Sequence, residues 1–142
     1  MTDADTIDYV LDDQVGYLLR LASQRHAVLF QATMEDGLTP TQFATLIRVA
    51  EEGEVSQNQL GRLAAMDVAT IKGVVDRLRA KGLIASRSDV QDRRRSVITL
   101  TRAGERMIGA LRRKGAEISA ATLEPLTASE QRTLIALLRK IS

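Results

Sequence analysis

The stretch "DVATIKGVVDRLRAKGLIASRSDVQDRRRSVITL", residues 67–100, decides the fold because it joins a helical pattern to two short β-type runs. Apolar residues recur every three to four positions in its first half, which predicts an amphipathic helix over 67–81 that begins at Asp67 and stops at Gly82. The expected buried face consists of aliphatic side chains: Val68, Ile71, Val74, Val75 and Leu78. The runs "LIASRS" and "RSVITL" in the second half predict a β-hairpin.

The loop of this hairpin carries three adjacent arginines, Arg93, Arg94 and Arg95. Like charges repel, and a guanidinium is costly to bury, so the loop must lie in solvent or against an anionic partner. Asp89 and Asp92 stand just before the arginines. We expect these carboxylates to cap the turn and to hold one guanidinium in a bidentate pair, which would aim the loop.

A shorter helical pattern precedes this stretch, opening at Ser56 and ending in the turn "AAMD", residues 64–67. Two helices joined by a tight turn and followed by a hairpin are typical of a winged helix-turn-helix. In that motif the second helix enters the major groove of duplex DNA, and we expect the hairpin, or wing, to lie over the adjacent minor groove. The side chains expected to contact DNA are small or basic: Ala69, Thr70, Lys72, Gly73, Arg77, Arg93, Arg94 and Arg95.

The distribution of charge favours this interpretation. Residues 72–113 hold 12 of the 20 Lys and Arg but 4 of the 18 Asp and Glu, a local charge of +8, while the whole chain carries only +2. For the helix over 67–81 alone, a solvated polar face is an equally good alternative, but such a face normally mixes the two signs. A basic helix followed at once by a basic hairpin favours a polyanionic partner.

Helical spacing also covers most of the remaining chain. Two capping pairs, Thr39 with Gln42 and Thr127 with Glu130, mark helix starts. We therefore expect a mainly α fold with a small β wing, in a single chain of residues 1–142. Its expected parts are a winged helix-turn-helix lobe over 39–100 and helical regions over 13–36 and 101–142.

Composition disfavours an enzyme. The chain has no cysteine and one histidine, and it lacks a Gly-rich phosphate loop and an HExxH-like cluster, so we expect no catalytic residues, metal or cofactor. Asp89 and Asp92 would be poor general acids because the neighbouring arginines hold both ionised. No apolar run approaches the length of a membrane span, and the acidic start "MTDADTIDYVLDD" is unlike a signal peptide. We expect a cytoplasmic protein with no membrane partner.

From about residue 13 to its end the chain resembles the MarR family of bacterial transcriptional regulators. The resemblance rests on "LTPTQFATL", "VVDRLRAKGLI", "SDVQDRRRSVITLTRAG" and "LTASEQRTLIALLRKI". In the wing pattern of the family, Asp-x-Arg-Asp-x-Arg, Asp89, Asp92 and Arg94 match, and Gln91 replaces the middle arginine.

The resemblance implies a homodimer whose terminal helices, 13–36 and 101–142, form the dimerisation region. It also implies binding to a pseudo-palindromic promoter site, usually as a repressor. Release would follow binding of a small effector such as an aromatic carboxylate, a phenolic or a thioester. Cysteine-based oxidant sensing, known in some relatives, is excluded because the chain has no cysteine.

In the family, the effector pocket lies where the first, second and fifth helices meet the DNA-binding lobe. Phe30 and Phe43 would supply apolar walls, while Arg20, Arg25 or His26 would pair with an anionic head group. The alternative for His26 is a core or interface histidine bonded to a carbonyl. For the whole chain, the alternative is a winged-helix module that binds RNA or protein and has no effector.

Overall fold

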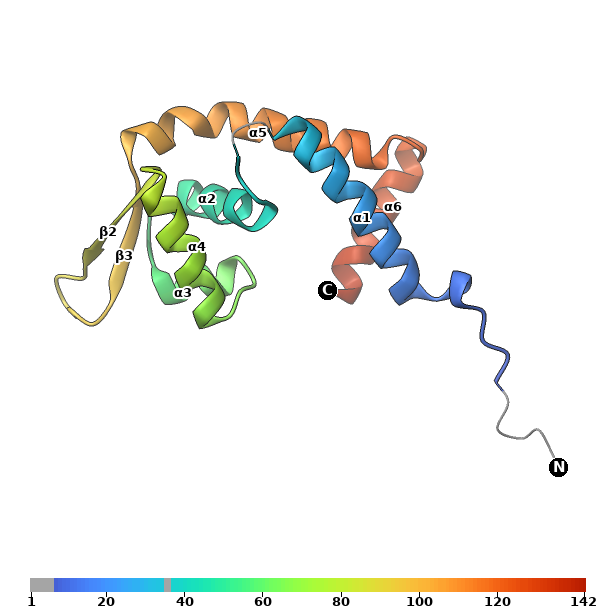
Figure 1. Cartoon of the computed structure of the whole chain (residues 1–142), viewed down its shortest axis with the longest axis horizontal. Coiled ribbons are helices and arrows are strands. Elements are labelled where there is room, and N and C mark those ends of the chain that lie inside the picture. Colours follow the sequence, from blue (N-terminus) through green and yellow to red (C-terminus); the bar gives the residue numbers. More distant parts are fainter. Residues whose placement is uncertain (1–6, 35–36) are drawn as a thin grey trace. The chain divides into compact units, whose positions relative to one another are not determined.

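The computed structural model describes residues 7–34 and 37–142 and is mostly helical (Figure 1). The expected mainly α class with a small β wing is confirmed. The elements are η1 (Leu11–Asp13, a 3-10 turn), α1 (Val15–Thr33), α2 (Pro40–Glu52), β1 (Glu54–Ser56), α3 (Gln57–Leu63), α4 (Val68–Ala80), β2 (Ile84–Ser88), β3 (Ser96–Leu100), α5 (Arg102–Leu123) and α6 (Ala128–Ile141).

The chain divides into two compact units. The winged-helix unit consists of Met34–Glu117. The terminal unit combines the described residues up to Thr33 with Ile118–Ser142. Helix α5 contributes to both, since its last six residues belong to the terminal unit.

Local signals define the helix starts of the winged-helix unit. Thr39 and Gln42 form a reciprocal capping box at the start of α2, where Pro40 is the first helical residue. Gly53 ends the same helix with φ of +77°, a conformation that favours glycine. The side chain of Ser56 caps α3 by accepting a bond from the backbone N–H of Gln59.

The sheet of this unit has three antiparallel strands in the order β1-β3-β2. The predicted hairpin is confirmed, with Ile84 opposite Leu100 and Ser88 opposite Ser96. Strand β1 was not expected from the sequence. Its three residues become a strand only by pairing with β3, where Val55 lies opposite Ile98, and so distant a partner leaves no local signal.

The core of the winged-helix unit lies between α2, α3, α4, α5 and the sheet. Its fully buried side chains include Leu46, Leu60, Ile71, Val75, Leu78, Ile98 and Leu111. The expectation that Val68 belongs to this core is wrong, because its side chain is 71% exposed. Helical spacing extends the apolar face of α4 to Val68, but the packing stops one turn later, at Ile71.

The terminal unit is formed by α1, α6 and the end of α5. Its helices are joined by side-chain bonds to backbone carbonyls: Arg25 donates to the Thr122 and Ala121 oxygens at 2.6 and 2.9 Å, and Gln131 donates to Leu123 and Leu126. A capping box of Thr127 and Glu130 starts α6. None of the helices in the described part of the chain is long and apolar enough to cross a membrane.

Candidate nucleic-acid interface

Helix α4 presents its first turn and its polar side to solvent. Its cap is Asp67, whose carboxylate accepts the Thr70 N–H at 2.7 Å, and this bond lowers the pKa of Asp67. Of the five residues predicted to contact DNA from this helix, Ala69, Thr70, Lys72 and Arg77 are exposed and Gly73 is half-buried.

The position of α4 depends on its close contact with α3. A Cβ atom on Gly61 would lie 3.1 Å from Ile71 Cγ2 and 3.2 Å from the Met66 carbonyl oxygen, so a larger residue there would push the helices apart. The turn between them is closed by a 2.8 Å bond from the Met66 N–H to the Gly61 oxygen and contains Ala65 at φ of +55°. The expected tight turn between two helices is thus present.

Two of the three basic side chains of α4 are bonded to one carboxylate. Asp76 accepts Lys72 Nζ at 3.1 Å and Arg79 Nη2 at 2.7 Å, and the bond from Lys72 is the main cause that lowers the pKa of Asp76. Arg77 is placed differently, since its Nη1 atom would lie 3.3 Å from a Cβ added to Gly73. Glycine at this position therefore leaves room for the guanidinium.

The wing loop is held by its two aspartates. Asp89 Oδ1 accepts the Gln91 N–H at 3.0 Å, and Asp92 Oδ1 accepts the Arg94 N–H at 3.1 Å. Backbone bonds from Asp89 to the Arg95 oxygen and from Arg95 to the Asp92 oxygen close the loop.

The expected bidentate pair between an aspartate and an arginine of the wing is not formed. Arg94 reaches Asp92 only through Nε, at 3.2 Å, and its side chain remains 92% exposed. The same carboxylate oxygen accepts both the backbone N–H and the Nε–H of Arg94, whereas a bidentate pair would use two side-chain N–H groups on the two carboxylate oxygens.

Two of the three wing arginines meet the start of α3. Arg94 and Arg95 line a small polar cavity of about 90 Å³ together with four polar residues, Ser56, Gln57, Asn58 and Ser96. Arg93 is exposed and does not line this cavity. Guanidinium, hydroxyl and amide groups in such an arrangement can bind an oxyanion such as a backbone phosphate.

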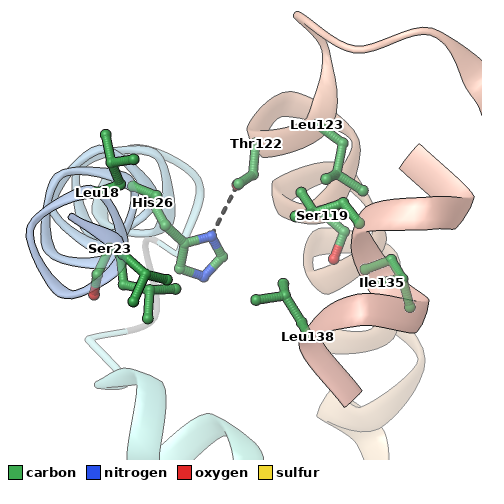
Figure 2. Close-up of a pocket in the computed structure, with 12 residues that line it drawn as sticks. Leu18, Ser23, His26, Ser119, Thr122, Leu123, Ile135 and Leu138 are labelled. Atoms are coloured by element: carbon green, nitrogen blue, oxygen red, sulfur yellow. Dashed lines mark hydrogen bonds between the residues drawn. The ribbon is translucent and has the colours of Figure 1, made fainter. Parts of the chain in front are cut away.

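A larger apolar groove lies in the terminal unit (Figure 2). It encloses about 530 Å³, and its lining consists of Val15, Leu18, Leu19, Ala22, Ser23, His26, Ser119, Thr122, Leu123, Leu134, Ile135 and Leu138. Figure 2 shows the imidazole of His26 extending from α1 towards Thr122 of α5, with Nδ1 lying 2.8 Å from Thr122 Oγ1. Because Thr122 Oγ1 donates its own proton to the Ile118 oxygen, His26 Nδ1 is the donor of this bond, and a neutral ring then has Nε2 as its acceptor.

The structure does not bring the five expected effector residues together in this groove. Only His26 lines it, and its partner is a hydroxyl rather than the expected carbonyl. Arg20 is exposed, Arg25 binds the last carbonyls of α5, and Phe30 is buried. Phe43 belongs to the winged-helix unit, where a Cβ on Gly115 would lie 2.8 Å from its Cζ.

Sequence reasoning also missed the polar groups that share the groove with His26. Ser23 lies one turn before His26, and Ser119 lies one turn before Thr122. The spacing of three residues places the two members of each pair on the same face of their helix, and this much can be read from the sequence. That the two faces meet in one groove follows only from the packing of α1 against the end of α5.

Comparisons with known proteins agree with this architecture. Residues 38–96 match the MarR family. The chain is 38% identical to the HTH-type transcriptional repressor NicR of Pseudomonas putida, an alignment that covers 96% of this chain and 87% of NicR.

Two solved structures are similar over nearly the whole chain. A probable transcriptional regulator from Pseudomonas aeruginosa is 48% identical with a TM-score of 0.90, covering 94% of this chain and all of the other. BpsR of Bordetella bronchiseptica, whose DNA binding is regulated by 6-hydroxynicotinic acid, is 36% identical with a TM-score of 0.90, covering 95% and 97% of the two chains. The winged-helix architecture expected from the sequence is confirmed.

Proposed function

The chain belongs to the MarR family of transcriptional regulators, and we propose on that premise that it is a homodimeric, ligand-responsive repressor. It acts in the cytoplasm, where it binds a pseudo-palindromic DNA operator and dissociates from it when a small aromatic or acyl effector binds.

The DNA-binding part of the proposal rests on the exposed surface of α4 and the wing. Ala69 and Thr70 are open to solvent in the first turn of α4, where a recognition helix meets base edges. Arg93, Arg94 and Arg95 supply positive charge at the wing, which suits phosphates or a narrow minor groove. In this arrangement α4 determines which sequence is bound, and the wing adds affinity that is largely independent of sequence.

The homodimer is supported by the apolar surface of the terminal unit. Exposed large side chains on α1 and α6 include Val15, Leu18, Leu19, Leu21, Val28, Leu134, Ile135, Leu137 and Ile141. A soluble monomer rarely exposes so many apolar side chains in one region, and a second copy related by two-fold symmetry would cover them. Such a dimer would present its two recognition helices about 34 Å apart, one turn of B-DNA.

The effector is proposed from the relatives and from the chemistry of the candidate side chains. BpsR responds to 6-hydroxynicotinic acid, a small aromatic carboxylate. In this chain, Arg20, Arg25 or His26 would pair with the carboxylate and Phe30 and Phe43 would contact the ring. A hundredfold loss of DNA affinity requires that the effector favour the non-binding state by about 2.7 kcal/mol.

The test begins with the mass of the purified chain at micromolar concentration and with selection of duplexes from a random pool. We expect a dimer and a selected pseudo-palindrome. Protein that stays monomeric, or that binds scrambled and selected duplexes equally, would contradict the proposal and favour a module for another partner.

The effector is then tested by titrating the protein–DNA complex with 6-hydroxynicotinic acid, other aromatic acids and their thioesters. The wild type is compared with His26→Ala and Phe43→Ala, and we expect both variants to need more of the releasing compound. A compound that releases all three proteins at the same concentration would show that these side chains are structural.

A further inference from the structure

We infer that the first turn of α4 recognises the 5-methyl groups of thymines, with Val68 as the residue that determines this preference. The inference rests on the proposed function, because it concerns which bases the DNA-binding surface selects.

The exposure of Val68 is the first observation. Its side chain is 71% exposed, whereas Ile71, one turn along the same apolar face, is 1% exposed. Val68 directly follows the cap residue Asp67, so its methyl groups lie at the end of the helix that a recognition helix directs at base edges. They are therefore available for contact with DNA rather than needed for the core.

The second observation is the chemistry of the residues around Val68. The exposed first turn consists of Val68, Ala69 and Thr70, which present methyl groups and one hydroxyl. Adenine and guanine are read by bidentate contacts from Asn, Gln, Arg or Lys, and this turn has none of those side chains. The cap carboxylate of Asp67 accepts bonds from both the N–H and the side chain of Thr70.

The nearest basic residue along the helix is also bonded to a neighbouring side chain. Lys72, the first basic residue of α4, is bonded to Asp76 at 3.1 Å. The apolar group that base pairs expose in the major groove is the thymine 5-methyl, and side chains such as Ala and the Thr methyl are its usual partners. Methyl contacts from Val68 and Ala69 thus match thymine.

The magnitude follows from the area that one methyl removes from water. Burying a methyl-sized group changes an equilibrium constant about fourfold. A thymine in contact with Val68 should therefore be bound about fourfold more tightly than deoxyuridine, which pairs identically but lacks the methyl.

The experiment uses duplexes selected with the full-length wild-type protein. Each thymine of one half-site is replaced in turn by deoxyuridine, and affinities are measured for the wild type, Val68→Ala and Val90→Ala. Val90 is the matched control, since it is 87% exposed but lies in the wing loop. The side chain of Val68 is mostly exposed and alanine is the better helix former, so Val68→Ala should fold normally.

We expect one or two thymines at which deoxyuridine weakens wild-type binding about fourfold. The ratio of the affinities for the thymine and deoxyuridine duplexes should fall to about one in Val68→Ala and stay about fourfold in Val90→Ala. If no replacement weakens binding, or if Val68→Ala retains the full loss, the inference is wrong while selective DNA binding stands. If no duplex is selected at all, the proposed function itself fails, and the inference with it.

Discussion

Asp76 is a negative charge among the cations of α4, one of which, Lys72, we assign to DNA binding, and removing it should change the salt dependence of DNA binding. Its carboxylate holds Lys72 and Arg79, both of which are mostly exposed. The pKa of Asp76 is lowered by these partners, so the group stays ionised at neutral pH and its charge is present whenever DNA binds. Asp76→Asn would release both cations to contact phosphates.

The size of the effect follows from counterion release. Each additional phosphate contact steepens the plot of log affinity against log salt by about 0.9, so two released cations would add about 1.8. Between 50 and 200 mM salt, the variant should lose affinity relative to the wild type by a factor of about 12, or about 3.5 if only one cation gains a contact. Selected and scrambled duplexes should both gain affinity at low salt, because phosphate contacts do not depend on the base sequence.

The assay measures the affinity of the wild type and the variant for selected and scrambled duplexes over this range of salt. Glu51→Gln is the control, because its carboxylate is 44% exposed against 43% for Asp76 and pairs with a single arginine, Arg48, at 3.0 Å. Both variants change the net charge equally. If their salt slopes are the same, Asp76 acts only through net charge and the reasoning about Lys72 and Arg79 is refuted.

Three further predictions concern the wing, the core and a helix cap. Arg94→Ala should weaken binding to selected and scrambled duplexes alike and flatten the salt slope by about 0.9; unchanged affinity would mean that the wing is only a solvated loop. Gly104→Ala should destabilise the fold by about 1–3 kcal/mol in urea unfolding, because the new Cβ would collide with the Leu83 carbonyl oxygen, and wild-type stability would refute that contact. Bonds from Thr127 lower the pKa of Glu130 below its ordinary 4.5. The contribution of the Glu130 carboxylate to stability is therefore present above pH 4.5 and is lost as the pH falls through the lowered pKa. Glu130→Gln should flatten this loss of stability in acid, and parallel pH profiles of stability for the variant and the wild type would contradict the prediction.

Signals within a few residues predicted most of the fold. The capping pairs at Thr39 and Thr127 and the periodicity of α4 from Ile71 to Leu78 each depend on near neighbours, and each agrees with the structure. Strand β1 was missed because its pairing with β3 is non-local. Val68 was misplaced because periodicity describes a face of a helix but not how far along that face the packing extends.

The candidate site was less predictable for the same physical reason. The exposure of Lys72 and Arg77 could be expected from helical spacing, whereas the pairing of Lys72 with Asp76 needs side-chain geometry. His26 was named as a candidate partner of an anionic head group, yet its partner Thr122 lies 96 positions away and is visible only in the folded chain.

The central claim, selective binding by a two-fold symmetric dimer, is tested most directly by changing the spacing of the two operator half-sites. The selected duplex is compared with one in which about half a helical turn, roughly five base pairs, is inserted between the half-sites, so that the second faces the opposite side of the DNA. The account predicts that affinity for the longer duplex falls to that of a single half-site. Equal affinity for the two duplexes would contradict it.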